Sequence, residues 1–334
     1  MHLTIYVTAG HLSLIYSFLF GVVLPPGGAM AWPPFCPESC VCGLQTSSAS
    51  PEQRRTVECS SIGLTSPPSN LTADVEMLML GSNRIRPDSL NALANYVNMS
   101  ELNIAQNHIY GLGDIKVVLS SLLYVVIDGN ELDYLANKSF WWAPHLRRLS
   151  VRRNKIELIH AEAFVGLADL RILDLSDNRL FSVIPEWFRD LVSIDELDLG
   201  QNNIHVLRDG VFRLATTLRS LDISLNQLQH LYDGAFGGLK SLRKLILQGN
   251  NLKQFPVVAL RRLAALREAN LNRNPFQALY TSSVSDLSVA TLSMSHMDRL
   301  QFIDRRAFSN LDPSQPTRNA PQQIPELHRS GSVL

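Results

Sequence analysis

The segment 170–180, LRILDLSDNRL, decides the fold, because its arrangement of apolar residues and Asn recurs along the chain. Leu170, Leu173, Leu175, Asn178 and Leu180 define the frame L-x-x-L-x-L-x-x-N-x-L. A fixed period of this length is typical of a repeat architecture in which each unit contacts only its neighbours. The Asn of the frame occurs at spacings of 24, 23 and then six times 24 residues: Asn83, Asn107, Asn130, Asn154, Asn178, Asn202, Asn226, Asn250 and Asn274.

The frame predicts one short strand and one inward turn in every repeat. Leu-x-Leu is a period-two pattern, so alternate side chains face the interior and the strands stack in parallel, roughly 4.8 Å apart. The intervening positions then form an exposed concave sheet. The Asn amide both donates to and accepts from backbone groups of the neighbouring turn, and replacing one Asn by Leu should cost about 1–3 kcal/mol.

A second ladder with a step of 24 residues runs along the opposite side of each repeat. We interpret it as an apolar spine inside short helical or 3₁₀ turns, rather than as a cofactor-binding stripe. The predicted fold is therefore an α/β solenoid, a horseshoe with a concave parallel sheet and short helical or 3₁₀ turns on its convex side. The members of the spine are Phe140, Phe164, Phe188, Phe212, Phe236, Leu260, Val284 and Phe308.

The pattern weakens in a tenth repeat and then stops. Met297 stands where Asn is expected, and Asp298 is predicted to replace it after a slip of one residue. No further repeat follows Leu311, and residues 312–334 contain four Pro and little apolar material. That composition predicts a disordered tail.

The amino terminus has the features of a targeting segment. A 13-residue apolar run at 12–24 is followed by Pro-Pro-Gly-Gly and then by the small-x-small triplet 29–31. These features favour a signal peptide over residues 1–31 that is cleaved after Ala31. An uncleaved signal anchor is the alternative, because the stretch from Leu3 to Leu24 is apolar enough to span a bilayer and no Lys or Arg precedes the apolar run.

All four cysteines lie in one cluster, Cys36, Cys40, Cys42 and Cys59. In an exported chain, an even and clustered set favours disulfides. A zinc site is the alternative, but the single residue between Cys40 and Cys42 fits the usual zinc-ligand spacing poorly.

Charge and motifs argue against catalysis and against nucleic acid as the partner. The chain has 30 Lys plus Arg and 30 Asp plus Glu, so charge recognition has to be local. The sequence holds no nucleophile elbow, zinc-protease motif, phosphate loop or dinucleotide turn. We therefore expect no enzyme, no cofactor, no metal site and no small-molecule substrate.

Two columns of charge are predicted on the concave sheet. Arg147, with Arg or Asp in the following repeats, forms the first, and Asp174, Asp198 and Asp222 form the second. One interpretation is a self-neutralising lattice of surface pairs, each worth about 0–1 kcal/mol. The other is a site for a charged partner, because like charges on adjacent strands are destabilising and need a reason to persist.

The third repeat differs from the others. Leu123, Tyr124 and Val126 take concave positions beside Arg147 and Arg148 of the fourth repeat. Apolar and aromatic residues next to Arg are typical of an interaction hot spot, although exposure that is tolerated or covered by a glycan is an equal alternative. N-glycosylation sequons begin at Asn70, Asn98 and Asn137.

The repeats and the cysteine cluster closely resemble the extracellular leucine-rich-repeat superfamily of the 24-residue type, over residues 36–311. The resemblance implies a cysteine-rich cap at 32–70, which pairs Cys36 with Cys42 and Cys40 with Cys59, and about ten repeats at 71–311. Members often carry a second cysteine-rich cap after Asn-Pro-Phe, but no cysteine follows residues 274–276 here.

The resemblance implies a secreted binding or adhesion module that engages a protein or a proteoglycan through its concave face. A structural component of the extracellular matrix is one alternative. A truncated or soluble form of a receptor is another. Membrane attachment is expected only if the signal peptide stays uncleaved or the chain is a shortened one.

Overall fold

The computed structural model describes residues 36–47, 50–113, 115–280, 283–284, 287 and 289–307, all within one compact unit, Trp32–Leu334. The expected signal peptide and tail, together with Phe308 and Leu311, lie outside the described residues. None of the described helices has both the length and the apolar character needed to cross a membrane.

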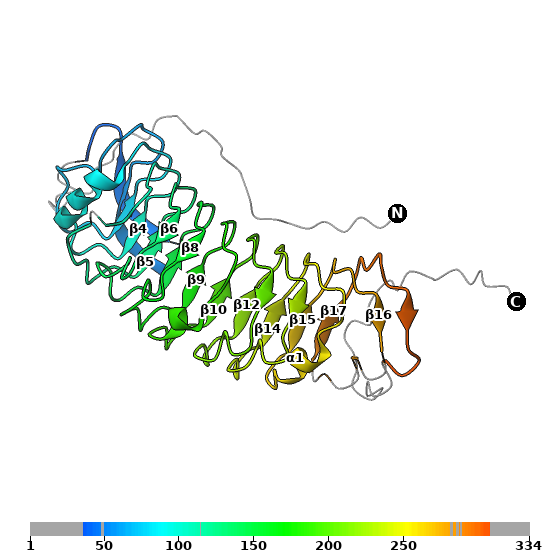
Figure 1. Ribbon diagram of the computed structural model, residues 1–334. Coiled ribbons are helices and arrows are strands. Elements are labelled where there is room, and N and C mark those ends of the chain that lie inside the picture. The colour runs from blue at the N-terminus through cyan, green and yellow to red at the C-terminus, as the bar shows by residue number, and fades with distance from the viewer. Residues whose placement is uncertain are drawn as a thin grey trace, which may run out of the picture. The chain divides into compact units, whose positions relative to one another are not determined.

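A 12-stranded sheet runs the length of the described chain in the order β1-β2-β3-β4-β5-β7-β9-β10-β12-β14-β15-β17 (Figure 1). From β2 onward every strand pairs in parallel with the next. The strands are β1 (Val41–Ser47), β2 (Ser50–Glu58), β3 (Met77–Met79), β4 (Glu101–Asn103), β5 (Tyr124–Val126), β7 (Arg148–Ser150), β9 (Ile172–Asp174), β10 (Glu196–Asp198), β12 (Ser220–Asp222), β14 (Lys244–Ile246), β15 (Glu268–Asn270) and β17 (Thr291–Ser293).

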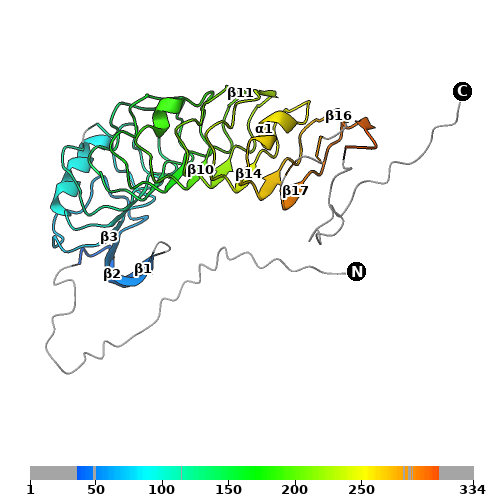
Figure 2. The ribbon, with the colours of Figure 1, turned by 90° about the horizontal axis from the view of Figure 1, so that it is seen from below.

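The predicted solenoid is confirmed, with its sheet and its helical turns on opposite sides (Figure 2). The turns of the convex side are mostly irregular and include three short helices, η1 (Pro87–Asn95), η2 (Pro185–Phe188) and α1 (Val257–Arg261). Pro87 and Pro185 each stand in the first turn of a 3₁₀ helix, where a missing backbone N–H costs nothing.

Three two-stranded parallel ladders, which the sequence did not predict, follow the ladder Asn. They pair β6 (Tyr134–Leu135) with β8 (Leu158–Ile159), β11 (Val206–Leu207) with β13 (His230–Leu231), and β16 (Ala278–Leu279) with β18 (Phe302–Ile303). Each is only two residues long, which is too short for an alternating pattern to stand out.

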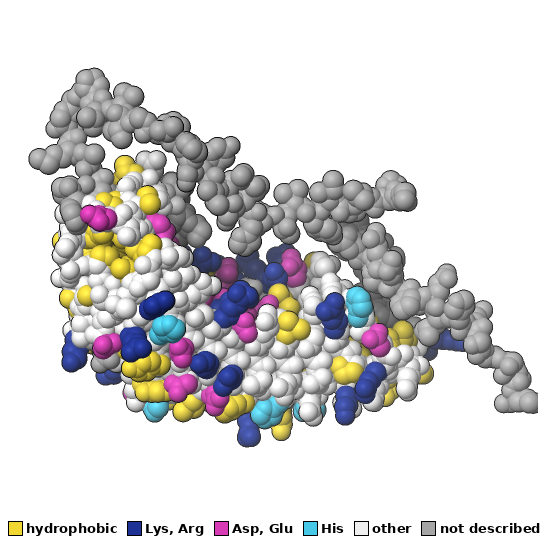
Figure 3. Space-filling model, turned by 90° about the horizontal axis from the view of Figure 1, so that it is seen from above, with side chains coloured by type: hydrophobic (Ala, Val, Ile, Leu, Met, Phe, Trp, Pro, Cys, Tyr) yellow, Lys and Arg dark blue, Asp and Glu magenta, His cyan; other side chains and the backbone are white. Residues whose placement is uncertain are grey.

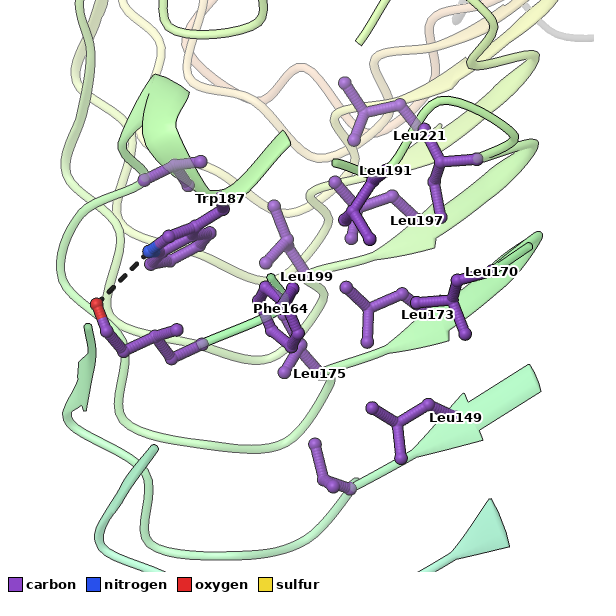
Figure 4. Close-up of a cluster of buried hydrophobic side chains, with 14 of the residues drawn as sticks. Leu149, Phe164, Leu170, Leu173, Leu175, Trp187, Leu191, Leu197, Leu199 and Leu221 are labelled. Carbon is purple, nitrogen blue, oxygen red and sulfur yellow. Dashed lines mark hydrogen bonds between the residues drawn. The ribbon is translucent and has the colours of Figure 1, made fainter. Parts of the chain in front are cut away.

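Leucines from successive strands line up in one row inside the solenoid. Leu149, Leu173, Leu197 and Leu221 are in register and at most 2% exposed, and Figure 4 shows them pointing toward the spine. Within the described residues, the spine is buried as predicted from Phe140 to Val284. Trp187 packs beside it and donates its Nε1–H to the carbonyl of Ile159 at 3.2 Å. Full burial of one such Leu contributes about 1.5–3 kcal/mol.

The Asn ladder has the predicted bonds. Asn178 donates from Nδ2 to the carbonyl oxygens of Val151 at 3.1 Å and Leu175 at 3.0 Å. Its Oδ1 accepts the N–H of Ile156 at 3.1 Å. All nine Asn are buried, with at most 8% of the residue exposed. The amide of each ladder Asn thus links its own coil to the preceding coil.

The amino-terminal cap is an antiparallel hairpin, β1–β2, that continues the sheet by one parallel pairing to β3. Disulfides join Cys36 to Cys42 and Cys40 to Cys59, the pairing that the family resemblance implies. Cys59 is 1% exposed because the hairpin covers the first coil.

The last coil is one residue out of phase at its strand and is less well closed. β17 pairs with β15 at a spacing of 23 residues, and His296 has the positive φ that Arg273 has one coil earlier, so Met297 holds the place of the ladder Asn. The spacing returns to 24 only where Ala278 pairs with Phe302, so the predicted replacement of the ladder Asn by Asp298 is wrong. The thioether of Met297 has no N–H to donate to the neighbouring carbonyl groups, and Asp298 is exposed and makes no hydrogen bond to any described residue.

Candidate functional site

The concave face is built from the strand positions whose side chains do not enter the core. The last residues of the parallel strands from β3 to β17 form one column, in register along the sheet: Met79, Asn103, Val126, Ser150, Asp174, Asp198, Asp222, Ile246, Asn270 and Ser293. Figure 3 shows Lys, Arg, Asp and Glu side chains gathered where the surface of the molecule is hollowed. The residues that the sequence assigned to a binding site all belong to this face.

Asp174, Asp198 and Asp222 form an acidic row on three adjacent strands, as the repeat spacing predicts. Each carboxylate also holds its own turn, which the sequence analysis missed. Asp174 Oδ1 accepts the N–H of Ser176 at 2.9 Å, and Asp198 Oδ1 accepts that of Gly200 at 2.8 Å. Asp222 Oδ1 accepts that of Ser224 at 2.7 Å. A small residue two positions after Asp is the sequence signal for such turns.

The middle of the acidic row is crowded. A Cβ atom added to Gly200 would lie 3.1 Å from Asp198 Oδ1 and 3.3 Å from Ser224 Oγ, so only glycine fits there without a shift. Burial, with smaller contributions from the charges of Asp222 and Asp174, raises the pKa of Asp198 to about 6, although the hydrogen bond from the Gly200 N–H lowers it. Burial likewise raises the pKa of Asp128, on the third repeat.

Leu123, Tyr124 and Val126 form an apolar spot on the third repeat, and all three side chains are half-buried. Tyr124 lies in register between Glu101 and Arg148, and Val126 lies between Asn103 and Ser150. Tyr124 therefore lies between an acidic and a basic neighbour on the sheet, and Val126 lies between two neutral polar ones.

Two buried charged atoms near the apolar spot have no hydrogen-bond partner among the described residues. They are Oε2 of Glu101 and Nε of Arg152. The charge of Arg152 lowers the pKa values of Asp128 and Asp198, so its guanidinium lies in the field of both carboxylates. Buried charged atoms without a partner are costly, and this cost is removed when a ligand or water supplies the missing bond.

The predicted arginine column is present at the edge of the strands. Arg171 N–H donates to the carbonyl of Arg147 at 2.9 Å, and the same bond recurs along the following repeats. Arg219 pairs with Asp195 at 3.2 Å, whereas Arg147 is exposed and has no ion pair within the described chain. The pairing of arginine with aspartate is thus only partial, because most of the column is arginine.

The three sequon asparagines are all exposed. Asn98 donates from Nδ2 to the carbonyl of Ala73 at 3.0 Å, and Asn70 Oδ1 accepts the Ser69 hydroxyl at 3.0 Å. Asn137 lies with Tyr134 and Trp141 at a depression of about 150 Å³ on the side of the solenoid. These positions are away from the concave strands.

The described residues contain no group of three or more His, Cys, Asp or Glu arranged to hold a metal ion. The predicted binding residues do not converge on one pocket either. They spread over strands β5 to β12.

A family model described as "Leucine rich repeat" matches residues 144–204, 195–252 and 216–276. Among solved structures, the chain is similar to one from the crystal structure of the TLR13–ssRNA13 complex, at 25% identity and a TM-score of 0.61. That match covers 69% of this chain and 36% of the other, so the chain spans little more than a third of that protein's length.

A second likeness is to a chain of an octameric complex of Latrophilin 3, Unc5D and FLRT2, the last represented by its leucine-rich repeats. The identity is 23% and the TM-score 0.60, over 70% of this chain and 74% of the other. This likeness is one of fold. The chain therefore contains leucine-rich repeats over residues 144–276, and its described fold is a leucine-rich-repeat solenoid of 24-residue repeats with a disulfide-bonded cap.

Proposed function

We propose that this chain is an extracellular binding protein that recognises a protein partner through the concave face of repeats three to seven. The contact residues are those predicted from the sequence, and they occupy the acidic row, the apolar spot and the arginine column next to it: Tyr124, Val126, Arg147, Arg148, Asp174, Asp198 and Asp222.

The apolar spot carries the proposal. Tyr124 and Val126 are half-buried on the concave face. Ile172 and Ile246 are also on this face, but Tyr124 is the aromatic side chain among its strand positions, and charged residues flank it on both sides. Energetic hot spots combine a desolvated aromatic anchor with Arg and with surrounding residues that exclude water. Glu101 and Arg148 lie in register with this anchor and offer a partner one acceptor and one donor.

The acidic row favours a partner with basic side chains. Three carboxylates on adjacent strands repel one another, and the raised pKa of Asp198 reports that repulsion together with desolvation. A Lys or Arg of the partner would relieve it. The same row disfavours nucleic acid, because a phosphate backbone binds where cations neutralise it.

The structural likenesses support a binding role without identifying the partner. One similar chain belongs to a complex with single-stranded RNA, and the other to an assembly of several proteins. For this chain the charges of the concave face favour protein, and RNA is one outcome of the test below.

The disulfide-bonded cap and the three exposed sequons support an extracellular location. The proposed organisation has a signal peptide at 1–31, a cap at 32–70, repeats at 71–311 and a tail at 312–334.

Expression of the full chain in animal cells should give a secreted glycoprotein whose apparent mass falls on treatment with an N-glycosidase. Asn70→Gln, Asn98→Gln and Asn137→Gln should each reduce the apparent mass of the untreated protein by one glycan. Retention of an unglycosylated chain in the cytosol would refute the location.

The binding surface is tested with the full chain, carrying a carboxy-terminal tag, against an array of extracellular protein domains. Any protein that binds is measured again with Tyr124→Ala combined with Arg148→Glu. We expect the affinity to fall by more than about a hundredfold, because an aromatic anchor and an Arg are both lost. Tyr232→Ala combined with Arg213→Glu is the matched control away from the concave strands.

Three outcomes would overturn this assignment. Equal losses in the concave variant and in its control would move the interface elsewhere. Partners that bind both variants normally would exclude the concave face. Binding of single-stranded RNA that survives physiological salt, with no protein partner, would replace a protein by a nucleic acid.

A further inference from the structure

A polar pocket of about 650 Å³ opens at the carboxy-terminal end of the described solenoid, away from the proposed concave site. It lies along the rim where the ladder Asn residues turn, between the coils of Asn250 and Asn274 and the coil of Asp298. Its origin is the interrupted ladder, because Met297 stands at the ladder position and its thioether makes none of the bonds that close the earlier coils. Its volume is in the range that holds a sugar-sized ligand.

Unpaired positive charge surrounds this pocket. Lys253, Arg273 and Arg299 line it, opposed by the single carboxylate of Asp298. All four side chains are exposed, and none makes an ion pair with another described residue. His296 lines the same pocket and contacts Ser295 Oγ at 3.1 Å.

The same rim is electrically balanced in the earlier repeats. Arg153 holds the repeat position that Arg273 holds later, and it pairs with Asp177 of the next coil at 3.2 Å. The residue equivalent to Asp177 after Arg273 is His296, so the carboxylate is missing. Lys155 pairs with Glu131 at 3.2 Å, and Arg179 with Glu157 at 3.3 Å. In the pocket, by contrast, three cations lie near a single carboxylate, and none of them forms an ion pair with a described residue.

The remaining lining is rich in amides. Gln229 and Asn251 are exposed at the pocket, and their side chains make no hydrogen bond within the described chain. Each amide can donate and accept, which suits hydroxyl groups. Guanidinium groups bind planar or tetrahedral oxyanions through paired N–H donors. A ligand that carries both anionic groups and many hydroxyls matches this lining better than an acidic peptide with apolar side chains does.

We propose that this pocket binds a sulfated sugar unit of a glycosaminoglycan-type polysaccharide. Arg273, Arg299 and Lys253 contact its sulfate and carboxylate groups, and the amides of Gln229 and Asn251 contact its hydroxyls. The site is separate from the concave face, so the chain can hold a polysaccharide and a protein partner at the same time.

The test measures binding of a heparin-derived tetrasaccharide to the full chain by calorimetry at physiological salt. Replacing Lys253, Arg273 and Arg299 by Ser should weaken binding by more than about tenfold, since each charge-assisted contact is worth more than a neutral one. The control replaces Arg153, Lys155 and Arg179 by Ser, which removes the same charge from the same rim. It should change the affinity by less than about threefold, because those cations already have partners.

Thermal melts of both variants show whether each is folded, and a conservative variant, Arg273→Lys with Arg299→Lys, should keep most of the affinity if folding is the concern. Equal losses in the two Ser variants would reduce the effect to general charge attraction and overturn the proposal. So would a tetrasaccharide that binds equally after chemical desulfation. Competition by a poly-Glu peptide at the same concentration would assign the pocket to an acidic peptide, and equal competition by inorganic sulfate would reduce it to a simple anion site. Loss of this site would leave the concave interface unaffected.

Discussion

The apolar core is more completely buried at the amino-terminal end of the described solenoid than at its carboxy-terminal end. At the amino-terminal end the β1–β2 hairpin covers the first coil, and Val57 and Leu78 are fully buried. In the last described coil, Leu292 and Met294 occupy the positions that are buried in every earlier repeat, yet both are half-exposed, and Phe302 is 50% exposed. The apolar frame thus places a side chain toward the interior, but burial requires a neighbour on both sides of the coil.

The largest effect on stability is expected when one Leu is replaced by Ala in an interior coil, compared with the same replacement in the last coil. Leu173→Ala should lower the free energy of unfolding by about 3–4 kcal/mol, because a fully buried side chain leaves a cavity. Leu292→Ala should cost less than about 1.5 kcal/mol, since its site is already partly open. Urea unfolding followed by circular dichroism measures both. Equal losses would show that the last coil is as closed as the interior.

Removing the cap's disulfide should have the next largest effect. Cys40→Ser with Cys59→Ser opens a link between residues 19 apart and should cost about 3 kcal/mol. Hydrogen exchange should rise first in β2 and β3, while β15 and β17 keep their wild-type rates. A uniform rise along all strands would mean that the cap stabilises the whole stack and not its own end.

Substitutions at the Asn ladder should lower the free energy of unfolding in an interior coil and raise it in the last coil. Asn202→Leu removes bonds donated to the carbonyls of Leu175, Leu199 and Gly200 and one accepted from Leu180, so a loss of about 2 kcal/mol is expected. Met297→Asn supplies the missing donor at the ladder position of the last coil and should add about 1 kcal/mol. Thermal denaturation of the two variants is the measurement. A destabilised Met297→Asn protein would show that the last coil has no room for the ladder bonds.

The smallest expected effect concerns the carboxylate of Asp198, whose ionised form destabilises the interior of the concave face. Because the pKa of Asp198 is raised to about 6 from its ordinary value of 3.8, the folded chain binds more protons than the unfolded chain between these pH values. The wild-type free energy of unfolding should therefore fall as the pH rises through this window. Asp198→Asn keeps the acceptor for the Gly200 N–H and removes the charge, so it should be about 1 kcal/mol more stable at pH 7.5.

That stability gain should vanish near pH 4, where the wild-type carboxyl group is already protonated. Unfolding curves at both pH values give the comparison. A variant that is less stable than the wild type at pH 7.5 would mean that the ionised carboxylate of Asp198 stabilises its turn by more than its burial and the neighbouring charges cost.

Much of the candidate site could be predicted from the sequence because the constant repeat length determines which residues lie next to each other on the sheet. Residues 24 positions apart lie side by side, so the acidic row and the position of Tyr124 beside Arg148 follow from counting. The turn bonds of the Asp side chains were missed, because a column of like charges suggested only a role toward a partner. The D-x-S and D-x-G spacing at 174–176, 198–200 and 222–224 was the available signal.

The sequence by itself determined the solenoid, its strand register, its Asn ladder and its aromatic spine, because each depends on a pattern that one repeat imposes on the next. Only the tertiary structure decided how far each position is buried, which charges find partners, and where a pocket opens. Burial and pairing depend on what lies above and below a given coil. The same frame therefore gives a dry core at Leu173, a crowded carboxylate at Asp198 and an open polar pocket beside Asp298.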